Sequence, residues 1–259
     1  MNIIVCVKHV PDTEAVIKPH PDGSGIALEG SNYVLNPYDE YAVEEAIRIK
    51  EANADATITV ITVGPDDATK SLRTAIAMGA DDAIHLNDPA FLETDSQGIA
   101  TILAAAIRPL PYDLILCGKQ AVDNDCAQVG AALAELLGIP GISVITELSV
   151  ETGKATAHRE LEGATEIIEC TLPALFTAQK GLNEPRYPAL PMIMKAKRKE
   201  IKTLDASALG LSPGDFAPRS RRLKVSSPPP RQAGRVLEGK VSEVVTEVVR
   251  LIREEAKIL

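Results

Sequence analysis

The chain of 259 residues contains no tryptophan and only eight other aromatic residues, five Tyr and three Phe. Single-stranded nucleic acids stack their bases on aromatic side chains, so this scarcity argues against nucleic-acid binding. No apolar run approaches the roughly 18 residues that a membrane helix needs. The N-terminus, MNIIVCVKHVPDT, has a short apolar run, no basic stretch and an early Pro-Asp turn, unlike a signal peptide. We therefore expect a cytoplasmic protein without direct membrane insertion.

Cysteine and histidine are also scarce. The cysteines are Cys6, Cys117, Cys126 and Cys170. The histidines are His9, His20, His85 and His158. The sequence contains no C-x-x-C pair, and no cysteine has a histidine nearby in metal-site spacing. We interpret the cysteines as reduced, buried thiols, and we expect neither a metal site nor a catalytic nucleophile.

Several nucleotide-binding loops of enzymes are missing as well. The sequence has no G-x-x-x-x-G-K-[ST], no G-x-G-x-x-G and no S-G-G-x-D-S pattern. Phosphoryl or adenylyl transfer therefore lacks its usual machinery, and we predict no catalytic residue. We interpret the acid pairs Asp39-Glu40 and Glu44-Glu45 as charges at a helix start and on a helix surface.

The first 145 residues do contain a regular alternation of strand and helix patterns. Short apolar runs predict strands at residues 2–7, 56–63, 83–86, 114–117 and 142–145. Apolar residues at helical spacing predict helices after Asn36, after Asp66, after Asp95 and from about Gln128 to Leu137. This alternation predicts an α/β fold with a doubly wound, mostly parallel sheet.

The pattern changes in the second half of the chain. Residues 147–160 and 165–177 predict antiparallel strands around Glu162-Gly163, which extend the sheet at one edge. Residues 183–235 are rich in Pro, Lys and Arg and favour an extended arm. An apolar stripe between Gly239 and Lys257 predicts a terminal helix that packs on the body or on a partner.

Charge divides the chain at nearly the same place. Residues 1–180 contain 11 Lys+Arg and 27 Asp+Glu, a balance of −16, whereas residues 181–259 contain 16 and 9, a balance of +7. Such asymmetry favours a separate body and an arm that meets another surface. We therefore expect an α/β domain at residues 1–182 and a C-terminal arm with its helix at residues 183–259.

A ligand site is expected at the carboxyl ends of the parallel strands. Three predicted loops lie there, after Val7, at residues 62–65 and at residues 118–125. The third is polar and opens a helix with Gln128 and Gly130 in its first turn. Free N–H groups at such a start bind anions, and Gly130 would let a ligand approach closely. The alternative is an ordinary loop capped by Asp125.

Residues 182–199 read LNEPRYPALPMIMKAKRK, and this segment closely resembles the signature of electron-transfer flavoprotein β subunits. The resemblance extends over nearly the whole chain. The matching motifs are V-K-x-V-P-D at 7–12, N-P-Y-D-E-Y-A-V-E-E-A at 36–46, A-M-G-A-D at 77–81, G-K-Q-A-V-D-N-D at 118–125 and H-R-E-L-E-G at 158–163.

The resemblance implies an obligate heterodimer. An α subunit would hold most of the redox FAD, and this chain would supply an adenine-nucleotide-binding domain whose arm wraps the partner. Simple carriers of the family bury one AMP in the β subunit. The residues at matching positions are Cys6, Asn36, Val63, Asp123, Asn124, Asp125, Cys126, Gln128, Val129 and Gly130. Thr13 and Tyr38 match residues that approach the FAD edge, although the family often has Tyr at the first position.

The signature segment 182–199 serves in the family as a recognition loop for acyl-CoA dehydrogenases. By this resemblance, Leu190 plugs an apolar pocket on the partner. Its flanking prolines, Pro188 and Pro191, would hold it out at low entropic cost. The cations that would rim the contact and steer the partner are Lys195, Lys197 and Arg198. The alternative is that Leu190 packs in the core of the chain.

Three functions stay open at this point. The first is an electron carrier with no chemistry of its own, which links flavin dehydrogenases of fatty acid oxidation to a membrane or other redox acceptor. The second is an NADH-oxidising, electron-bifurcating complex with a second FAD in place of AMP. Residues 36–39 fit those relatives, Asp95-Ser96 fits in part, and residues 98–102 do not. The third is a stand-alone ATP-binding regulatory protein, which the basic arm and apolar last helix speak against.

Overall fold

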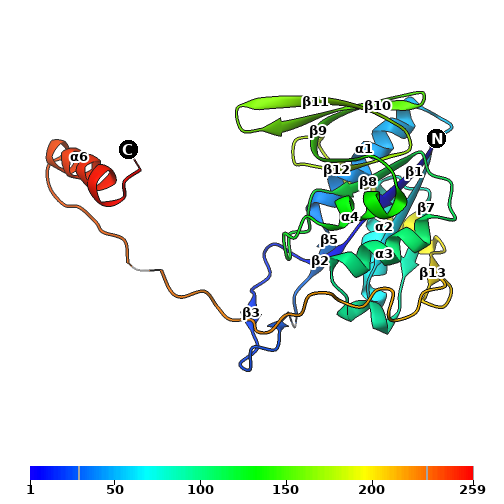
Figure 1. Cartoon of the computed structure of the whole chain (residues 1–259), viewed down its shortest axis with the longest axis horizontal. Helices are drawn as coiled ribbons and strands as arrows, with labels where there is room; N and C mark the ends of the chain where they lie inside the picture. The colour runs from blue at the N-terminus through cyan, green and yellow to red at the C-terminus, as the bar shows by residue number, and fades with distance from the viewer. Residues whose placement is uncertain (29, 232, 259) are drawn as a thin grey trace.

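The structure, a computed structural model, describes residues 1–28, 30–231 and 233–258. Its centre is a nine-stranded sheet in the order β11-β10-β9-β12-β8-β1-β6-β7-β13 (Figure 1). The parallel strands are β1 (Asn2–Cys6), β6 (Thr57–Val63), β7 (Asp82–Leu86), β8 (Leu114–Gly118), β12 (Ala174–Ala178) and β13 (Lys202–Leu204). Next to β12 lies β9 (Gly141–Glu151), also parallel, and β10 (Lys154–Leu161) and β11 (Ala164–Thr171) continue the sheet antiparallel. The predicted mostly parallel sheet with an antiparallel edge is confirmed.

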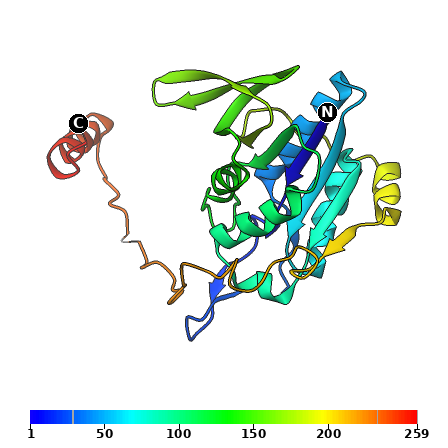
Figure 2. The same ribbon diagram turned by 45° about the vertical axis from the view of Figure 1, so that its right-hand side comes forward.

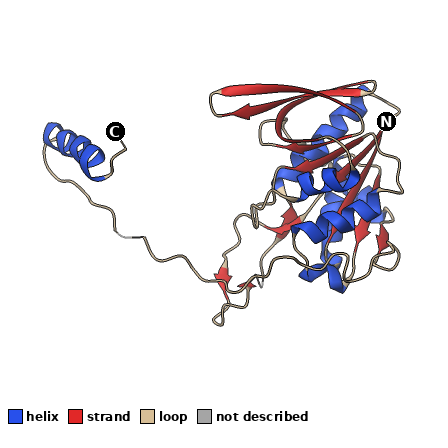
Figure 3. Ribbon diagram, viewed as in Figure 1, coloured by secondary structure: helices blue, strands red, loops and turns tan. Residues whose placement is uncertain are grey.

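Helices cover both faces of this sheet (Figure 3). On one face, α1 (Pro37–Ala52) and α2 (Thr69–Met78) share a core with Ile3 and Val5 of β1. On the other face, α3 (Ser96–Ile107) and α4 (Val129–Leu137) share a core with Ile4 and Cys6. Consecutive residues of β1 thus serve opposite cores, as the alternation of side chains along a strand requires. The fold is doubly wound, as predicted.

The helices begin and end at the residues that the sequence indicates. Pro37 opens α1, and the Asp95 carboxylate caps α3 by accepting from the N–H groups of Gln97 and Gly98. Gly138 ends α4 in the left-handed region at a φ of 68°, where a residue without Cβ is under no strain. Local chemistry therefore defines these ends of the three helices.

The antiparallel part differs from the prediction in its pairing. Residues 147–160 are the end of β9, a turn and most of β10, and residues 165–177 are most of β11 and of β12. Pro173 separates β11 from β12, and β12 returns to the middle of the sheet, between β9 and β8. Every residue of β12 is buried. Each of the two predicted strands is therefore divided between two strands, and the two strands within residues 165–177 have different neighbours.

The extended arm begins later than predicted. Residues 190–198 form a helix, α5 (Leu190–Arg198), which contacts α2, and β13 joins the sheet beside β7 (yellow at the right of Figure 2). Farther along the chain, Phe216 is buried against Phe91. The boundary predicted at residue 182 therefore lies inside the packed part of the chain. We call residues 1–216 the body and residues 217–258 the arm.

The arm is attached to the body at its root and then leaves it. Asp95, which caps α3, also accepts from the backbone N–H groups of Arg219 and Ser220 at 2.7 and 3.0 Å. Val225 donates its N–H to Gly23, between two short strands, β3 (Lys18–Pro19) and β4 (Ile26–Ala27). The arm ends in α6 (Val241–Arg250) and a π-helical turn (Leu251–Glu255), which stand away from the body (Figure 1). The predicted terminal helix is confirmed.

Within the described ranges, none of the helices combines the length and apolar character needed to cross a membrane. The cytoplasmic location stays a prediction.

Candidate functional site

The strand order identifies one position where a ligand site is expected. From β1, the chain adds β6 and β7 on one side and later adds β8 on the other side. Between β1 and β8 the connections change direction, and open α/β sheets bind ligands at the carboxyl edge of this switch point. Cys6, at the end of β1, lies opposite Cys117 of β8 and Ile61 of β6. Ile61 comes two residues before Val63, so the ends of the three strands lie side by side. The three predicted loops therefore leave the same edge of the sheet.

A buried carboxylate joins the loops on the two sides of the switch point. Asp39, in the first turn of α1, accepts from the Lys8 N–H at 2.7 Å and from the Gly118 N–H at 3.0 Å. Burial raises the pKa of Asp39 to about 7, against the opposing effect of these hydrogen bonds. A Cβ on Gly118 would lie 2.3 Å from Asp39 Oδ1, so this position requires glycine. The interpretation of Asp39 as an ordinary helix-start charge is wrong.

Asn36, directly before α1, holds the loop that follows β8. Its side-chain Nδ2 donates to the Gln120 carbonyl at 2.9 Å, and its Oδ1 accepts from the Val122 N–H at 3.1 Å. The residue is buried, and its side chain does not cap α1. Asn36 thus binds the backbone of the predicted ligand loop at two residues that lie 84 and 86 positions later in the sequence. These two hydrogen bonds hold the loop next to the start of α1.

The rest of this loop is polar, exposed and locally ordered. Lys8 Nζ contacts both carboxylate oxygens of Asp123, at 2.8 and 2.7 Å, and Gln120 donates to Asp125 at 2.6 Å. Asp125 and Ala127 both have a φ of 51°, a left-handed conformation that non-glycine residues adopt only at some cost. Asn124 Oδ1 accepts from the Cys126 N–H at 3.3 Å. The loop is therefore held by contacts among its own residues and by Lys8.

The start of α4 has no side-chain cap. Gln128 occupies the N-cap position, and none of the side chains that the structure describes caps the first N–H groups of the helix. The alternative of an Asp125 cap is therefore wrong. An uncapped helix start presents N–H donors and a partial positive charge, so its donor set fits a phosphate or another anion.

Gly130 has a different role from the one expected. The residue is buried and faces the sheet, where an added Cβ would lie 2.6 Å from Thr177 Cγ2 on β12. Glycine here allows α4 to lie close to β12, so it positions the helix start and is not an opening toward a ligand. The partner residue, Thr177, is 47 positions away in the sequence, which is why the sequence alone did not indicate this contact.

The cysteines do not form one group. Cys6 and Cys117 are buried neighbours on β1 and β8, and a hydrogen bond to the Cys6 thiol together with burial raises the pKa of Cys117. Cys126 is exposed and Cys170 is half-buried, so the prediction of buried thiols is confirmed only for Cys6 and Cys117. All four are free, and within the part of the chain that the structure describes no group of three His, Cys, Asp or Glu could hold a metal ion.

Tyr38 lies at the same edge of the sheet, whereas Thr13 follows the short strand β2 (His9–Pro11). Thr13 is exposed in a turn, between Asp12 and Glu14, which line a hollow of about 470 Å³. Tyr38 is half-buried in the first turn of α1, next to Gly118. These two residues come from different elements, and their predicted role near a flavin stays a prediction.

The predicted docking residues lie on a helix instead of a loop. Leu190 is the first residue of α5 and is 71% exposed, so the alternative of core packing is wrong. Pro191 is in the first turn of α5, where its missing N–H costs nothing. The three predicted rim cations, Lys195, Lys197 and Arg198, are all exposed in the last turn.

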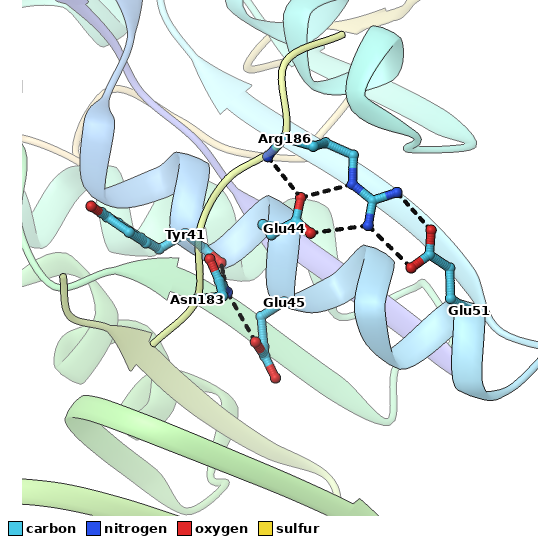
Figure 4. Close-up of polar contacts among 6 residues, drawn as sticks. All are labelled: Tyr41, Glu44, Glu45, Glu51, Asn183 and Arg186. Carbon is cyan, nitrogen blue, oxygen red and sulfur yellow. Dashed lines mark hydrogen bonds and ion pairs between the residues drawn. The ribbon is translucent and has the colours of Figure 1, made fainter. Parts of the chain in front are cut away.

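The interpretation of Glu44 and Glu45 as surface charges is wrong. Both are buried on α1, where Glu44 binds Arg186 and Glu45 binds Asn183 (Figure 4). Arg186 and Asn183 lie in the signature segment, 142 and 138 residues away from these partners. No short-range signal in the sequence indicates such a pairing.

Comparison with known proteins gives one consistent result. The sequence model of a family described as "Electron transfer flavoprotein domain" matches residues 24–209. The chain is 44% identical to "Electron transfer flavoprotein subunit beta" of Bacillus subtilis, with 100% of each chain covered. It is 37% identical to the protein of the same name from Sus scrofa, covering 100% of this chain and 99% of the relative.

A relative with a different name is also similar. The chain is 38% identical to "Caffeyl-CoA reductase-Etf complex subunit CarD" of Acetobacterium woodii, over 98% of this chain and 99% of that protein.

Proposed function

Because the chain belongs to the electron transfer flavoprotein family and is one of its beta subunits, we propose that it forms an obligate heterodimer with an α subunit that holds the redox FAD. The heterodimer carries electrons from flavin dehydrogenases, such as acyl-CoA dehydrogenases, to a membrane or other redox acceptor. FAD supplies the redox chemistry when bound. This chain supplies nucleotide binding, docking and assembly, and it has no catalytic residue of its own.

We propose that the ligand edge between β1 and β8 holds one AMP. The observation that carries this proposal is the uncapped start of α4, next to a polar loop that Asn36 and Asp39 fix in place. Phosphate suits the free N–H groups at that start. The residues that would hold the nucleotide are Cys6, Asn36, Val63, Asp123, Asn124, Asp125, Cys126, Gln128, Val129 and Gly130. Gly130 contributes by allowing α4 to approach the sheet. Thr13 and Tyr38 would lie near the FAD of the α subunit.

A second candidate is supported by the similarity to a subunit of a caffeyl-CoA reductase-Etf complex. In this version a second FAD occupies the same edge in place of AMP, and the complex oxidises NADH and bifurcates its electrons. The phosphates of FAD need the same N–H donors, so the uncapped helix start is compatible with both ligands. The family assignment leaves no support for a stand-alone ATP-binding regulator.

We also propose that α5 docks the electron-donating flavoenzyme. Leu190 and its neighbour Tyr187 are 71% and 97% exposed, and three cations follow at the end of the helix. An apolar anchor surrounded by charges is the arrangement that gives a transient complex both specificity and rapid association.

The nucleotide content of the purified heterodimer tests the first proposal. The two subunits are co-expressed, the complex is denatured, and FAD and AMP are quantified per heterodimer. One FAD and one AMP support the simple carrier. Two FAD without AMP overturn it in favour of the bifurcating complex. Absence of both a flavin and a stable heterodimer contradicts the proposed function.

A charge variant then tests the position of the nucleotide. Ala131 is exposed in the first turn of α4, so Ala131→Glu places a carboxylate beside the N–H donors. This carboxylate favours the helix itself but repels a phosphate. We expect Ala131→Glu to lose AMP while the α-held FAD stays bound. The neutral control Ala131→Gln should retain both ligands, and retention of AMP by Ala131→Glu would place the nucleotide elsewhere.

A further inference from the structure

One arginine fixes the segment between β12 and α5 to the surface of α1. The guanidinium group of Arg186 contacts both Glu44 and Glu51, which lie two helical turns apart on one face of α1 (Figure 4). Its Nε and Nη2 donate to the two oxygens of Glu44, each at 2.9 Å. Its Nη1 and Nη2 donate to Glu51 at 2.6 and 3.1 Å. The backbone N–H of Arg186 also donates to Glu44, at 3.1 Å.

This arrangement depends on the shape of arginine. A rigid guanidinium can serve two carboxylates at once, whereas a lysine is a single point charge. The hydrogen bonds that Arg186 donates to Glu51 and Glu44 raise the pKa of Arg186, and the same interaction lowers the pKa of Glu51. Only 5% of the Glu44 side chain is exposed, so loss of Arg186 would leave a buried carboxylate without its cation.

Asn183 provides a second attachment three residues earlier. Its Nδ2 donates to the Tyr41 carbonyl at 3.0 Å and to Glu45 Oε2 at 2.9 Å, both on α1. Asn183 is buried, and burial raises the pKa of Glu45. The chain is therefore held against α1 at residues 183 and 186, directly before the docking helix.

A second arginine holds the other end of α5. Arg73 on α2 places Nη1 at 2.6, 3.1 and 3.2 Å from the carbonyl oxygens of Ala196, Lys197 and Lys199. The last carbonyls of a helix lack intrahelical partners and carry partial negative charge, so a cation there stabilises the end of the helix. Lys199 also pairs with Asp82 at 2.7 Å.

Between these two attachments, α5 has little burial of its own. It is nine residues long, and its one buried residue is Ala196. Helices shorter than about 12 residues are marginal in water, so α5 does not form from its own sequence alone. Tyr187 and Leu190 are displayed between the arginine attachments with most of their surface exposed.

We propose that Arg186 and Arg73 are positioning residues for docking, which hold α5 in the one orientation that presents Leu190 to a partner flavoenzyme. This inference rests on the proposed docking function. Preorganisation lowers the cost of ordering an interface on binding, so the two arginines act on partner affinity without touching the partner. A purely structural role would not require the displayed segment to lie between them.

The test uses the complete heterodimer with an acyl-CoA dehydrogenase from the same organism. Two quantities are measured for each variant: amide hydrogen exchange of residues 188–199, and the KM and kcat of electron transfer with the heterodimer as the varied substrate. We expect Arg186→Ala to speed exchange in α5 and to raise KM about tenfold with kcat unchanged, which corresponds to loss of one well-ordered anchor. Arg73→Ala should act in the same direction.

Three further variants make the result specific. Arg186→Lys keeps the positive charge but loses the planar guanidinium that binds two carboxylates at once, so it should behave like Arg186→Ala. Glu51→Gln removes only the exposed partner, and it provides a milder test if Arg186→Ala fails to assemble. Leu190→Ala is the matched control, because it should raise KM and leave the exchange of α5 unchanged.

The possible outcomes distinguish the positioning role of the two arginines from the docking function of α5. Unchanged exchange in Arg186→Ala, Arg186→Lys and Glu51→Gln would overturn the positioning role. Faster exchange in these variants, together with a raised KM in Leu190→Ala alone, would also overturn it. If exchange rises in the arginine variants but neither they nor Leu190→Ala changes KM, the docking function of α5 is wrong.

Discussion

Helices α3 and α6 both have an apolar stripe, but they bury it to opposite extents. In α3 seven of the twelve residues are buried, and Ile102 is fully covered. In α6 none of the ten residues is buried, and Val241 and Val245 are 78% and 54% exposed. A ten-residue helix is not stable alone in water, so the stripe of α6 needs a surface that the body does not supply. Periodicity thus locates an amphipathic helix without telling which surface covers it.

The same substitution in the two helices gives the largest expected contrast. Ile102→Asp buries a charge among apolar side chains and should cost about 5 kcal/mol or more, enough to prevent folding of the subunit. Val245→Asp should leave the body folded, because Val245 contacts no core, and should abolish assembly with the α subunit. Circular dichroism and size-exclusion chromatography of the co-expressed subunits check both.

Thr246→Asp is the control for this contrast. Thr246 is exposed and neighbours Val245, so it receives the same charge at a different angle around α6. We expect it to assemble normally. If Val245→Asp also assembles normally, the apolar stripe of α6 is not the surface that meets the α subunit.

Glycine substitutions repeat the comparison between body and arm at a smaller scale. Gly130→Ala places a methyl group 2.6 Å from Thr177 Cγ2, and Thr177 Oγ1 is fixed by the Val144 N–H. Overpacking of this kind should cost about 3 kcal/mol and weaken nucleotide binding. Among the residues that the structure describes, Gly234→Ala in the arm meets no atom within 4 Å, so it should leave stability unchanged. Urea unfolding of both variants measures the difference, and equal midpoints would contradict the close packing of α4 on β12.

The sequence predicted what depends on neighbours along the chain. Strands β1, β6, β7 and β8 and helices α1 to α4 were found because their apolar periods, caps and turns are local. The polar loop after β8 is predicted for the same reason, since a polar segment follows a buried strand and opens a helix, and its role in ligand binding stays a prediction.

The features that the sequence did not reveal depend on distant partners. Glu44 looks like a surface charge until Arg186, 142 residues later, is brought onto α1. Gly130 looks like an opening for a ligand until Thr177 is placed behind it. The proline-rich sequence around α5 favours an irregular segment, although Pro191 lies in a first turn where proline is tolerated. Its last carbonyls are held by Arg73, from another helix.

The pH dependence of stability tests the buried carboxylate in the body. Burial raises the pKa of Asp39 from an ordinary value of 3.8 to about 7. Between these values the folded chain holds a proton that the unfolded chain has released, so Asp39 lowers the free energy of unfolding as pH rises. Asp39→Asn removes this titration and should flatten the dependence between about pH 4 and 7. It should also cost about 1 to 3 kcal/mol, because an amide offers one acceptor where two N–H groups donate.

Unfolding in urea at pH 5 and pH 7 measures this effect in both proteins. The other carboxylates contribute equally to the pH dependence of unfolding in the unmodified protein and in Asp39→Asn. The difference between the two pH slopes is therefore due to Asp39. Identical slopes would mean that the Asp39 carboxylate is ionised throughout this range.

Arg250 gives the smallest expected effect, and it completes the comparison because its chemistry matches that of Arg186. It binds two glutamates of its own helical segment, Glu247 at 2.6 Å and Glu254 at 2.9 Å, but all three side chains are well exposed. Exposed pairs of this kind contribute little, because water screens them and the side chains lose freedom. We therefore expect Arg250→Ala to leave the unfolding midpoint and α-subunit binding unchanged in the assays that detect Arg186→Ala and Val245→Asp. If Arg250→Ala instead disrupts the heterodimer as strongly as Val245→Asp, then the polar face of α6, and not its apolar stripe, meets the α subunit.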